Sequence, residues 1–334
     1  MYLGVDLGTS SMKCLVIGEE QEIIHSVSSE DIPLSNPQSG WSEQDPSSWI
    51  VAFDQCIKRL KEKININDIN SVSFSGHMHG ATCINEDHEI IRPCILWNDT
   101  RSHQECSEIM VDKSVMDIAG NIAMPGFTAP KVLWLKRNEN ENFNKIYKAL
   151  LPKDYLRFYL TGEFFSDLSD ASGTYWLDVE KRDWSQTLLD ASSMNISQMP
   201  SVCEGTDQTG TIKKDIAEKY GFNMKCKVYG GAGDNAAAAV VLKLGCSTIP
   251  FPGLPCSFLM GLITSTMACS FALSDVKEVA RGGWSTKSLN ATNRFRAASW
   301  ATSSDGSAMP IALIKGPHLT TSLRRILNSS YVNS

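Results

Sequence analysis

An excess of positive charge is the first thing that this 334-residue sequence lacks. It holds 31 Lys and Arg against 37 Asp and Glu, which gives a net charge of −6 at neutral pH. No basic stripe with interleaved aromatic residues occurs along the chain. Nucleic-acid-binding surfaces need such clustered positive charge because they neutralise phosphates. The composition therefore argues against a nucleic-acid partner.

Paired cysteines at metal-binding spacing are also missing. The ten cysteines are scattered, and no Cys-x2-Cys pair occurs. A zinc site is the alternative, but His77 and His79 lack the spacing of a metal-binding helix pair. Its other candidate ligands would be Cys83, Cys94, His103 and Cys106. Because the sequence shows no secretory leader, we expect reduced thiols and a cytoplasmic location.

Charged residues are scarce in one region only. Residues 1–235 carry 22 Lys and Arg and 34 Asp and Glu, whereas residues 236–334 carry 9 and 3, so the net charge changes from −12 to +6. The stretch 256–273 is uncharged and long enough to suggest a transmembrane helix. Its serine, threonine, glycine and cysteine content is poor for that role. A short buried or misordered segment is the better interpretation, and we expect no membrane partner.

A turn near the N-terminus has the features of a phosphate-binding site. Residues 2–7 and 14–17 read as two buried strands. Between them, Gly8, Thr9 and Ser10 bring backbone N–H groups and hydroxyls together in a concavity that suits oxyanions. Asp6, at the strand end, is placed to hold a metal ion or its water shell. An ordinary β-hairpin with an aspartate beside its turn is the alternative.

A second turn lies far downstream. A short strand over residues 227–229 runs into three glycines and then Asp234, and the alanines at 236–239 predict the start of a helix. Glycines allow backbone conformations that are closed to other residues and let a ligand approach closely. A single acid at the end of such a unit suits a general base. A helix-capping aspartate in a glycine-rich loop is the alternative.

Several further segments join these two turns in a specific set. They cover residues 41–46, 76–80, 96–101, 124–131, 151–156 and 166–174. With them the chain resembles the FGGY family of carbohydrate kinases, within the sugar kinase, heat-shock protein and actin superfamily, from residue 1 to about residue 239. Among the branches of this family it is most similar to the xylulokinases. Glycerol kinases typically carry an Arg-Glu pair where this chain has Met78-His79.

The resemblance implies an α/β fold of the ribonuclease H-like, actin-like ATPase type. The residues themselves are consistent with it. Asp45-Pro46 begins a capped amphipathic helix. Further predicted strands cover 69–74 and 81–84, and further predicted helices cover 128–135, 143–150 and 154–160. A meander of three strands followed by alternating helices and strands predicts a mixed sheet with flanking helices.

The resemblance also implies the site residues. In xylulokinases the Met-His pair lies at the substrate and the aspartate of the Gly-Gly-x-Gly-Asp turn is the base, which here are Met78, His79 and Asp234. The other expected sugar contacts are Trp97, Asn98, Asp99, Arg101 and Asn235. The expected phosphate contacts are Gly8, Thr9, Ser10 and Lys13, and Asp6 would hold Mg²⁺ directly or through water.

The expected reaction is ATP-dependent phosphorylation of a ketopentose, with D-xylulose the leading substrate and ATP and Mg²⁺ as cofactors. A related sugar such as ribulose, or a non-catalytic sugar-binding remnant, is the alternative. A small-molecule sugar is thus the expected partner, and a homodimer is an open option.

The resemblance ends after the second turn. Family members continue with a second actin-like lobe that opens with another Gly-Thr-Ser hairpin and supplies the adenosine site, and residues 261–265 are only a poor echo of that hairpin. We therefore expect a sugar-binding, first actin-like domain over residues 1–240. Residues 241–334 are expected to be a non-family tail, poorly ordered or produced by a shifted reading frame, with a divergent domain as the alternative. The expected activity of such a chain is weak or absent.

Overall fold

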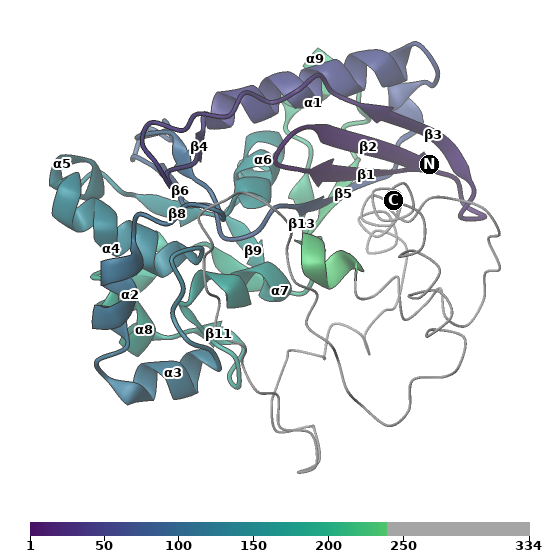
Figure 1. Ribbon diagram of the computed structural model, residues 1–334. Coiled ribbons are helices and arrows are strands. Elements are labelled where there is room, and N and C mark those ends of the chain that lie inside the picture. The colour runs from purple at the N-terminus through teal and green to yellow at the C-terminus, as the bar shows by residue number, and fades with distance from the viewer. Residues whose placement is uncertain (239–334) are drawn as a thin grey trace, which may run out of the picture. The chain divides into compact units, whose positions relative to one another are not determined.

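A seven-stranded mixed sheet forms the centre of the structure (Figure 1). The computed structural model describes residues 1–238, so the predictions for residues 256–273 and for the tail from residue 241 lie outside the described residues. The strands of this sheet are β1 (Tyr2–Leu7), β2 (Met12–Ile17), β3 (Ile23–Ser28), β5 (Ser71–Gly76), β13 (Gln208–Thr211), β14 (Lys227–Tyr229) and β15 (Ala232–Gly233). Their order is β13-β14-β5-β1-β2-β3, and β15 also pairs with β5.

Strand directions divide the sheet into two parts. The first three strands form an antiparallel meander, as predicted. β5 then returns parallel to β1 and lies beside it. On its other side, β5 pairs in parallel with β14 along its first residues and with β15 along its last. The predicted mixed sheet is therefore confirmed, with β5 at its centre.

Three helices cover one face of this sheet: α1 (Pro46–Lys61), α6 (Pro152–Thr161) and α9 (Lys214–Tyr220) (Figure 1). The predicted cap of α1 is present, because the Asp45 carboxylate accepts a hydrogen bond of 2.9 Å from the Ser47 N–H. Trp49 and Phe53 project from α1 into a buried core that also holds Val5 and Phe74 of the strands. Burial of this apolar surface is the main force that holds the helices to the sheet.

A second core lies beside the sheet, among shorter helices. Its buried members include Ile95, Val132, Leu135, Trp176 and Leu189. The helices and 3₁₀ helices of this part and its surroundings are α2 (His103–Ile109), α3 (Lys113–Ala119), α4 (Thr128–Asn138), α5 (Asn140–Phe143), α7 (Leu168–Ala171), α8 (Gln186–Ala191), η1 (Ile66–Asp68), η2 (Ser172–Thr174) and η3 (Ile196–Gln198). The remaining strands are β4 (Glu43–Gln44), β6 (Thr82–Ile84), β7 (Cys94–Ile95), β8 (Lys148–Leu150), β9 (Phe165–Asp167), β10 (Leu177–Asp178), β11 (Asp183–Trp184) and β12 (Ser201–Cys203).

One predicted helix is wrong. Residues 143–150 do not form a helix, because α5 ends at Phe143 and the chain then enters strand β8. β8 pairs antiparallel with β6, so that Leu150 lies opposite Thr82 and Lys148 opposite Ile84. Local sequence preference is weaker than such tertiary pairing. Residues 148–150 therefore form a strand, because they pair with β6.

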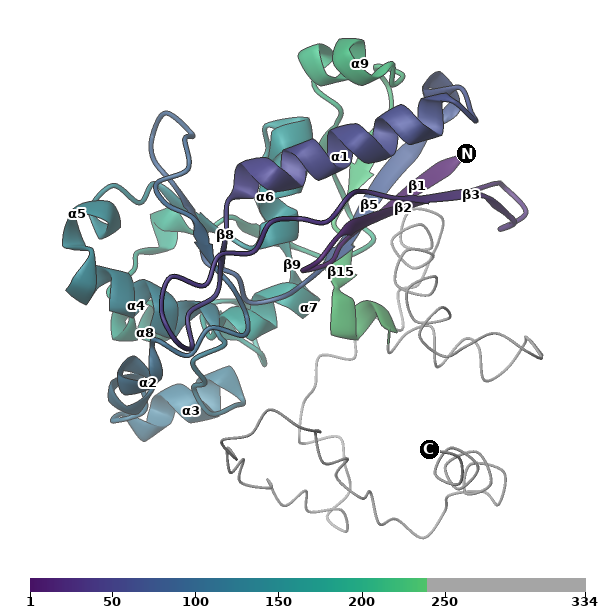
Figure 2. The same cartoon turned by 45° about the horizontal axis from the view of Figure 1, so that its top comes forward.

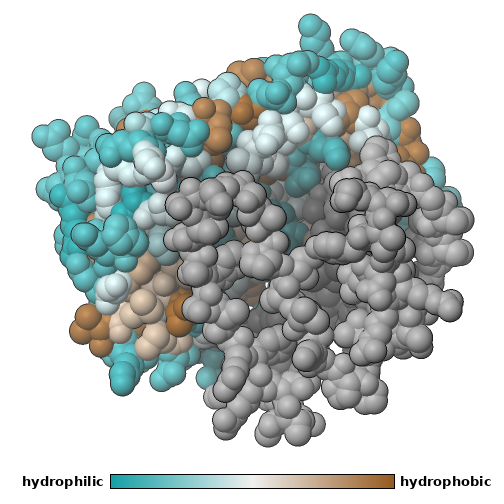
Figure 3. All heavy atoms as spheres, viewed as in Figure 1, coloured by the Kyte–Doolittle hydropathy of each residue, from teal (hydrophilic) through white to brown (hydrophobic). Residues whose placement is uncertain are grey.

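The surface agrees with the composition. Figure 3 shows a mostly hydrophilic surface over the described residues that are visible in that view, with hydrophobic side chains in small groups. Within residues 1–238, no helix combines the length and the apolar character that crossing a membrane would require.

Gly231, between β14 and β15, is a position where only glycine fits. Its φ is +80°, and a Cβ there would lie 2.0 Å from the Phe74 carbonyl oxygen of β5. Gly221 has nearly the same φ, +79°, but its Cβ would meet only a flexible Lys61 side chain at 3.9 Å. Substitution of Gly221 by alanine would therefore cause backbone strain alone, whereas substitution of Gly231 would cause strain and a steric clash.

We predict that Gly221→Ala lowers the free energy of unfolding by roughly 1–2 kcal/mol, the usual cost of a left-handed backbone for alanine. Gly231→Ala should cost about 2 kcal/mol more, because the strands must also move apart. Urea unfolding of the two variants measures the difference. Equal losses would show that β15 does not approach β5 this closely.

Candidate functional site

The candidate site lies where three parallel strands end. β1, β5 and β15 point the same way, so their carboxyl ends meet at one edge of the sheet, which is where open α/β sheets place ligands. Gly76 at the end of β5 is the register partner of both Leu7 and Gly233. Asp6 and Asp234 thus lie on either side of the β5 end, roughly 10 Å apart along the sheet at two strand spacings. Figure 2 shows β15 running into the short helix that begins at Asp234.

The carboxylate of Asp234 is chemically unusual. Its pKa is raised from 3.8 to about 6, chiefly by burial, and the nearby negative charge of Asp6 contributes in the same direction. A hydrogen bond of 2.7 Å from the Asn235 N–H to Asp234 Oδ1 opposes this shift. The two acids that the sequence places more than 200 residues apart therefore share one electrostatic environment. A carboxylate with a pKa of about 6 is a better proton acceptor than an ordinary one and is still ionised at pH 7.

The first turn is held rigidly beside Asp6. The Gly8 N–H donates to the Ser11 carbonyl at 3.1 Å, which closes the turn. The Gln44 side chain donates to the Thr9 carbonyl at 2.6 Å, and the Ser10 carbonyl accepts from the Ile32 N–H at 2.8 Å. A turn fixed on both sides loses little entropy when it binds an anion.

Lys13 and Trp97 connect this turn to its surroundings. Lys13 on β2 is the register partner of Asp6, so it lies at the same edge of the sheet. The Trp97 indole N–H donates to Thr9 Oγ1 at 3.1 Å. Trp97 is nevertheless 46% exposed, which leaves much of its ring available to a ligand. Asn98, next to it, is exposed as well.

Met78 and His79 lie in the loop after β5, next to the second turn. Met78 packs against Gly233 so closely that a Cβ there would come within 2.9 Å of its sulfur. The Asn235 amide nitrogen lies 4.0 Å from the same sulfur. His79 packs in turn against Gly173, where a Cβ would lie 2.4 Å from its Cε1. Two glycines therefore make room for the Met-His pair.

The protonation state of His79 follows from its contacts. Its pKa is lowered to about 4, chiefly by burial; a hydrogen bond to Gly173 acts in the opposite direction, and the positive charge of Lys131 contributes to the lowering. The ring is thus neutral at pH 7 and carries one proton. Its Nδ1 lies 2.7 Å from the Gly173 carbonyl oxygen, which can only accept, so that nitrogen holds the proton. Nε2 is left as an acceptor for a ligand hydroxyl.

Lys131 is a residue that sequence reasoning missed. Its fully buried ammonium donates to the His79 carbonyl at 2.8 Å and to the Gly126 carbonyl at 2.6 Å. The Thr128 hydroxyl donates to the same His79 carbonyl at 3.1 Å. These bonds hold His79 at a φ of +68°, which a residue with a side chain seldom adopts. Burial lowers the pKa of Lys131 to about 7. A lysine inside the apolar run of α4 was the signal that could have revealed it.

Asp99 and Arg101 require a correction, because their side chains are not available to a sugar. They are 1% and 7% exposed, and the Arg101 guanidinium binds the Asp99 carboxylate through two bonds of 2.9 and 2.7 Å. Arg101 also pairs with Glu43 at 2.7 Å and stacks 3.7 Å from the Trp41 ring centre. Such paired, buried charges fix a backbone. The pair therefore shapes the loop that carries Trp97.

The alternative zinc site finds no support in the described part of the chain. No group of three or more His, Cys, Asp or Glu side chains there is arranged to hold a metal ion. Burial raises the pKa of Cys83 and Cys106 to about 12 and that of Cys94 to about 11, so all three are unreactive thiols at pH 7. His77 is buried against Trp49, and burial lowers its pKa to about 3.

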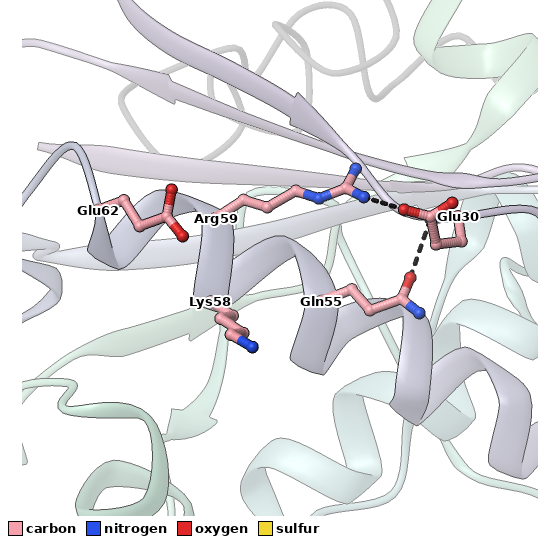
Figure 4. A pocket seen from close by; sticks show the side chains of 5 residues that line it. All are labelled: Glu30, Gln55, Lys58, Arg59 and Glu62. Carbon is pink, nitrogen blue, oxygen red and sulfur yellow. Dashed lines mark hydrogen bonds and ion pairs between the residues drawn. The ribbon is translucent and has the colours of Figure 1, made fainter.

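A separate hollow on the surface has no part in this site. It has a volume of about 300 Å³ and is lined by Glu30, Gln55, Lys58, Arg59 and Glu62 (Figure 4). Arg59 forms an ion pair with Glu30, and both side chains are largely exposed to solvent. Neither this hollow nor its lining includes any predicted site residue. We interpret it as a solvated charged surface.

Comparison with known proteins identifies the relatives of this chain. The family model described as "FGGY family of carbohydrate kinases, N-terminal domain" matches residues 1–241. A xylulose kinase of Escherichia coli K12 is 45% identical over 263 residues, which is 75% of this chain and 54% of that protein. The chain spans about half the length of the curated relatives that it matches.

Solved structures give the same relationship. A crystal structure of a xylulose kinase from Brucella ovis has a TM-score of 0.69 and 46% identity, covering 71% of this chain and 49% of that one. A gluconate kinase from Lactobacillus acidophilus has a TM-score of 0.68 and 27% identity, with 72% and 49% covered. The expected fold is thereby confirmed for the matched part.

The electrostatic link between the two acids can be tested directly. We predict that Asp6→Asn lowers the pKa of Asp234, because the substitution removes a like charge and leaves the burial in place. NMR titration of the Asp234 carboxyl carbon measures the pKa. Asp87→Asn, which neutralises an exposed carboxylate outside the site, should leave it unchanged. Equal pKa values in all three proteins would mean that Asp6 does not act on Asp234.

Proposed function

Because this chain belongs to the FGGY family of carbohydrate kinases, we propose that it binds a ketopentose and directs phosphoryl transfer from ATP to one of its hydroxyls. D-Xylulose is the proposed first substrate, since relatives that are 45% and 43% identical to this chain are named xylulose kinases. The single observation that carries the proposal is the position of Asp234 across the β5 end from Asp6, with a pKa raised to about 6. Asp234 is thus the proposed proton acceptor, and Asp6 is the acid proposed to hold Mg²⁺.

In the proposed reaction Asp234 is the general base. It accepts the proton of the attacking sugar hydroxyl as the oxygen forms a bond to the γ-phosphorus and the bond to the β,γ-bridging oxygen breaks. The proton then resides on Asp234 and ADP leaves. Such catalysis depends mainly on positioning and on electrostatic stabilisation of the phosphoryl group.

Sugar contacts are assigned to the residues whose surfaces remain available. Trp97 and Met78 supply apolar cover, and the neutral His79 accepts a hydroxyl through Nε2. Asn98 and Asn235 are exposed amides that can both donate and accept. An apolar wall with a few placed polar groups is the usual form of a small-molecule site.

Phosphate contacts are assigned to the first turn. The backbone of Gly8, Thr9 and Ser10 and the side chain of Lys13 would hold the phosphates of ATP. The hard carboxylate oxygens of Asp6 fit Mg²⁺, which takes oxygen ligands. When bound, the ion neutralises charge on the phosphate oxygens, and Asp6 would hold it directly or through water. A cytoplasmic location, and a homodimer as an option, stay predictions.

We predict that the full chain converts ATP to ADP slowly and only when D-xylulose is added, and that Asp234→Asn lowers kcat roughly a further 10²–10⁴-fold because the base is lost. A coupled ADP assay measures turnover, and calorimetry measures sugar binding in both proteins. Asn is nearly isosteric, so sugar binding should persist. Sugar binding without any turnover in the unchanged chain would contradict the kinase and leave a sugar-binding protein. Ribulose and gluconate serve as comparison substrates.

The pH dependence of turnover provides a second test. A base works only when ionised, so kcat should rise with pH and level off above the raised pKa of Asp234, about 6. A plot of kcat against pH, measured at saturating ATP and sugar, gives the pH at which kcat is half-maximal. A midpoint near 3.8, the ordinary value for aspartate, would exclude Asp234 in this buried environment as the base.

A further inference from the structure

A buried ionic cluster lies beneath the second turn and has no role in the proposed chemistry. Its centre is the Lys153 ammonium at the start of α6. Three carboxylates surround that nitrogen, with oxygens of Asp154 at 2.6 Å, Asp167 at 2.5 Å and Asp170 at 3.2 Å. All four side chains are at most 1% exposed. Charges buried this deeply are costly unless they are fully paired.

Arg157 adds a second cation to the cluster. Its guanidinium binds Asp154 Oδ1 at 2.8 Å. Two cations then face three carboxylates. Burial, with the charges of Asp167 and Asp154, raises the pKa of Asp170 well above its usual range even though Lys153 opposes the shift. This direction of shift favours the neutral form of Asp170, which lowers the excess of negative charge in the cluster.

Two arms connect this cluster to the turn that carries Asp234. In the first arm, Arg157 Nη1 donates to the Gly230 carbonyl at 2.7 Å. In the second arm, Asp167 Oδ1 accepts the Ser169 hydroxyl at 2.5 Å, and Ser169 Oγ in turn accepts the Gly233 N–H at 3.2 Å. Gly233 is the residue immediately before Asp234.

The turn needs such external support because its glycines restrict the backbone very little. The Gly230 N–H also donates to the Asp207 carbonyl at 3.1 Å, and the Gly231 N–H donates to the Gly205 carbonyl at 2.9 Å. At Gly233, the residue before Asp234, the backbone N–H donates to the side-chain oxygen of Ser169. A displacement of about 1 Å at a reacting group can cost roughly a hundredfold in rate.

We propose that the Lys153 cluster is the device that positions Asp234, and that Ser169 and Arg157 are the positioning residues through which it acts. The proposal rests on the proposed role of Asp234 as the base. Lys153, Asp154, Asp167 and Asp170 contribute by holding the two arms in place. None of them needs to touch the sugar or the phosphates.

Ser169 is the residue to change. Removal of Lys153, Arg157 or one of the acids would leave a buried partner charge uncompensated and would endanger folding. Ser169 is neutral and half-buried, and its loss removes one arm only. Ser172 is the matched control, because it also lies just after β9 and its hydroxyl donates to the Ser169 carbonyl at 2.7 Å without reaching the turn.

The experiment compares the full chain with Ser169→Ala, Ser169→Thr and Ser172→Ala. In Ser169→Ala the turn opens and Asp234 gains water, so its NMR-measured pKa should fall from about 6 towards 3.8. kcat should fall about tenfold or more with the KM for sugar within about twofold, since the base moves while the sugar contacts stay. Ser169→Thr keeps the hydroxyl and should restore both values, and Ser172→Ala should change neither.

The result that overturns the proposal is an Asp234 pKa in Ser169→Ala equal to that of the unchanged chain. If the unchanged chain transfers no phosphoryl group, the proposed kinase function fails, but the pKa comparison still decides whether Ser169 positions Asp234. If circular dichroism shows that Ser169→Ala is unfolded, Ser169→Cys takes its place. Its thiol is a weak donor and acceptor, so a partial fall in pKa supports the proposal and no fall contradicts it.

Discussion

Parallel pairing of β5 with strands on both of its sides is the constraint on which the rest of this structure depends. β1 pairs along the whole of β5 on one side, and β14 and β15 share the other. Because parallel strands end at the same edge, this pairing brings Asp6, the Met78-His79 loop and Asp234 together. The close approach at Gly231 makes the second pairing possible, since any side chain there would meet the β5 backbone.

Several buried charged side chains support the candidate site without being exposed to a ligand. Lys131 fixes the carbonyl of His79, Arg101 and Asp99 shape the loop of Trp97, and the Lys153 cluster holds the turn before Asp234. In each arrangement the polar atoms bind other groups of the protein. Buried polar networks of this kind favour one conformation over its competitors, which is what a site with fixed hydroxyl and phosphate contacts needs.

Sequence reasoning succeeded where chemistry is local. The strand–turn–strand unit around Gly8 and the capped helix that begins after Asp45 follow from neighbouring residues, and both are present. It failed where distant partners decide. Residues 148–150, at the end of the predicted helix 143–150, form a strand because they pair with β6, and Arg101 is buried because Glu43 and Trp41 surround it. Neither partner could be identified from spacing along the chain.

The sequence alone determined that this chain is an α/β protein of the FGGY family over its first 240 or so residues, because the turns and motifs are short and their residue types are specific. It also named both acids. Only the tertiary structure decided that Asp6 raises the pKa of Asp234, that His79 is neutral with its proton on Nδ1, and that Lys131 and Ser169 support the site. Burial and charge at short range cause these properties, and both depend on which distant segments the sheet places side by side.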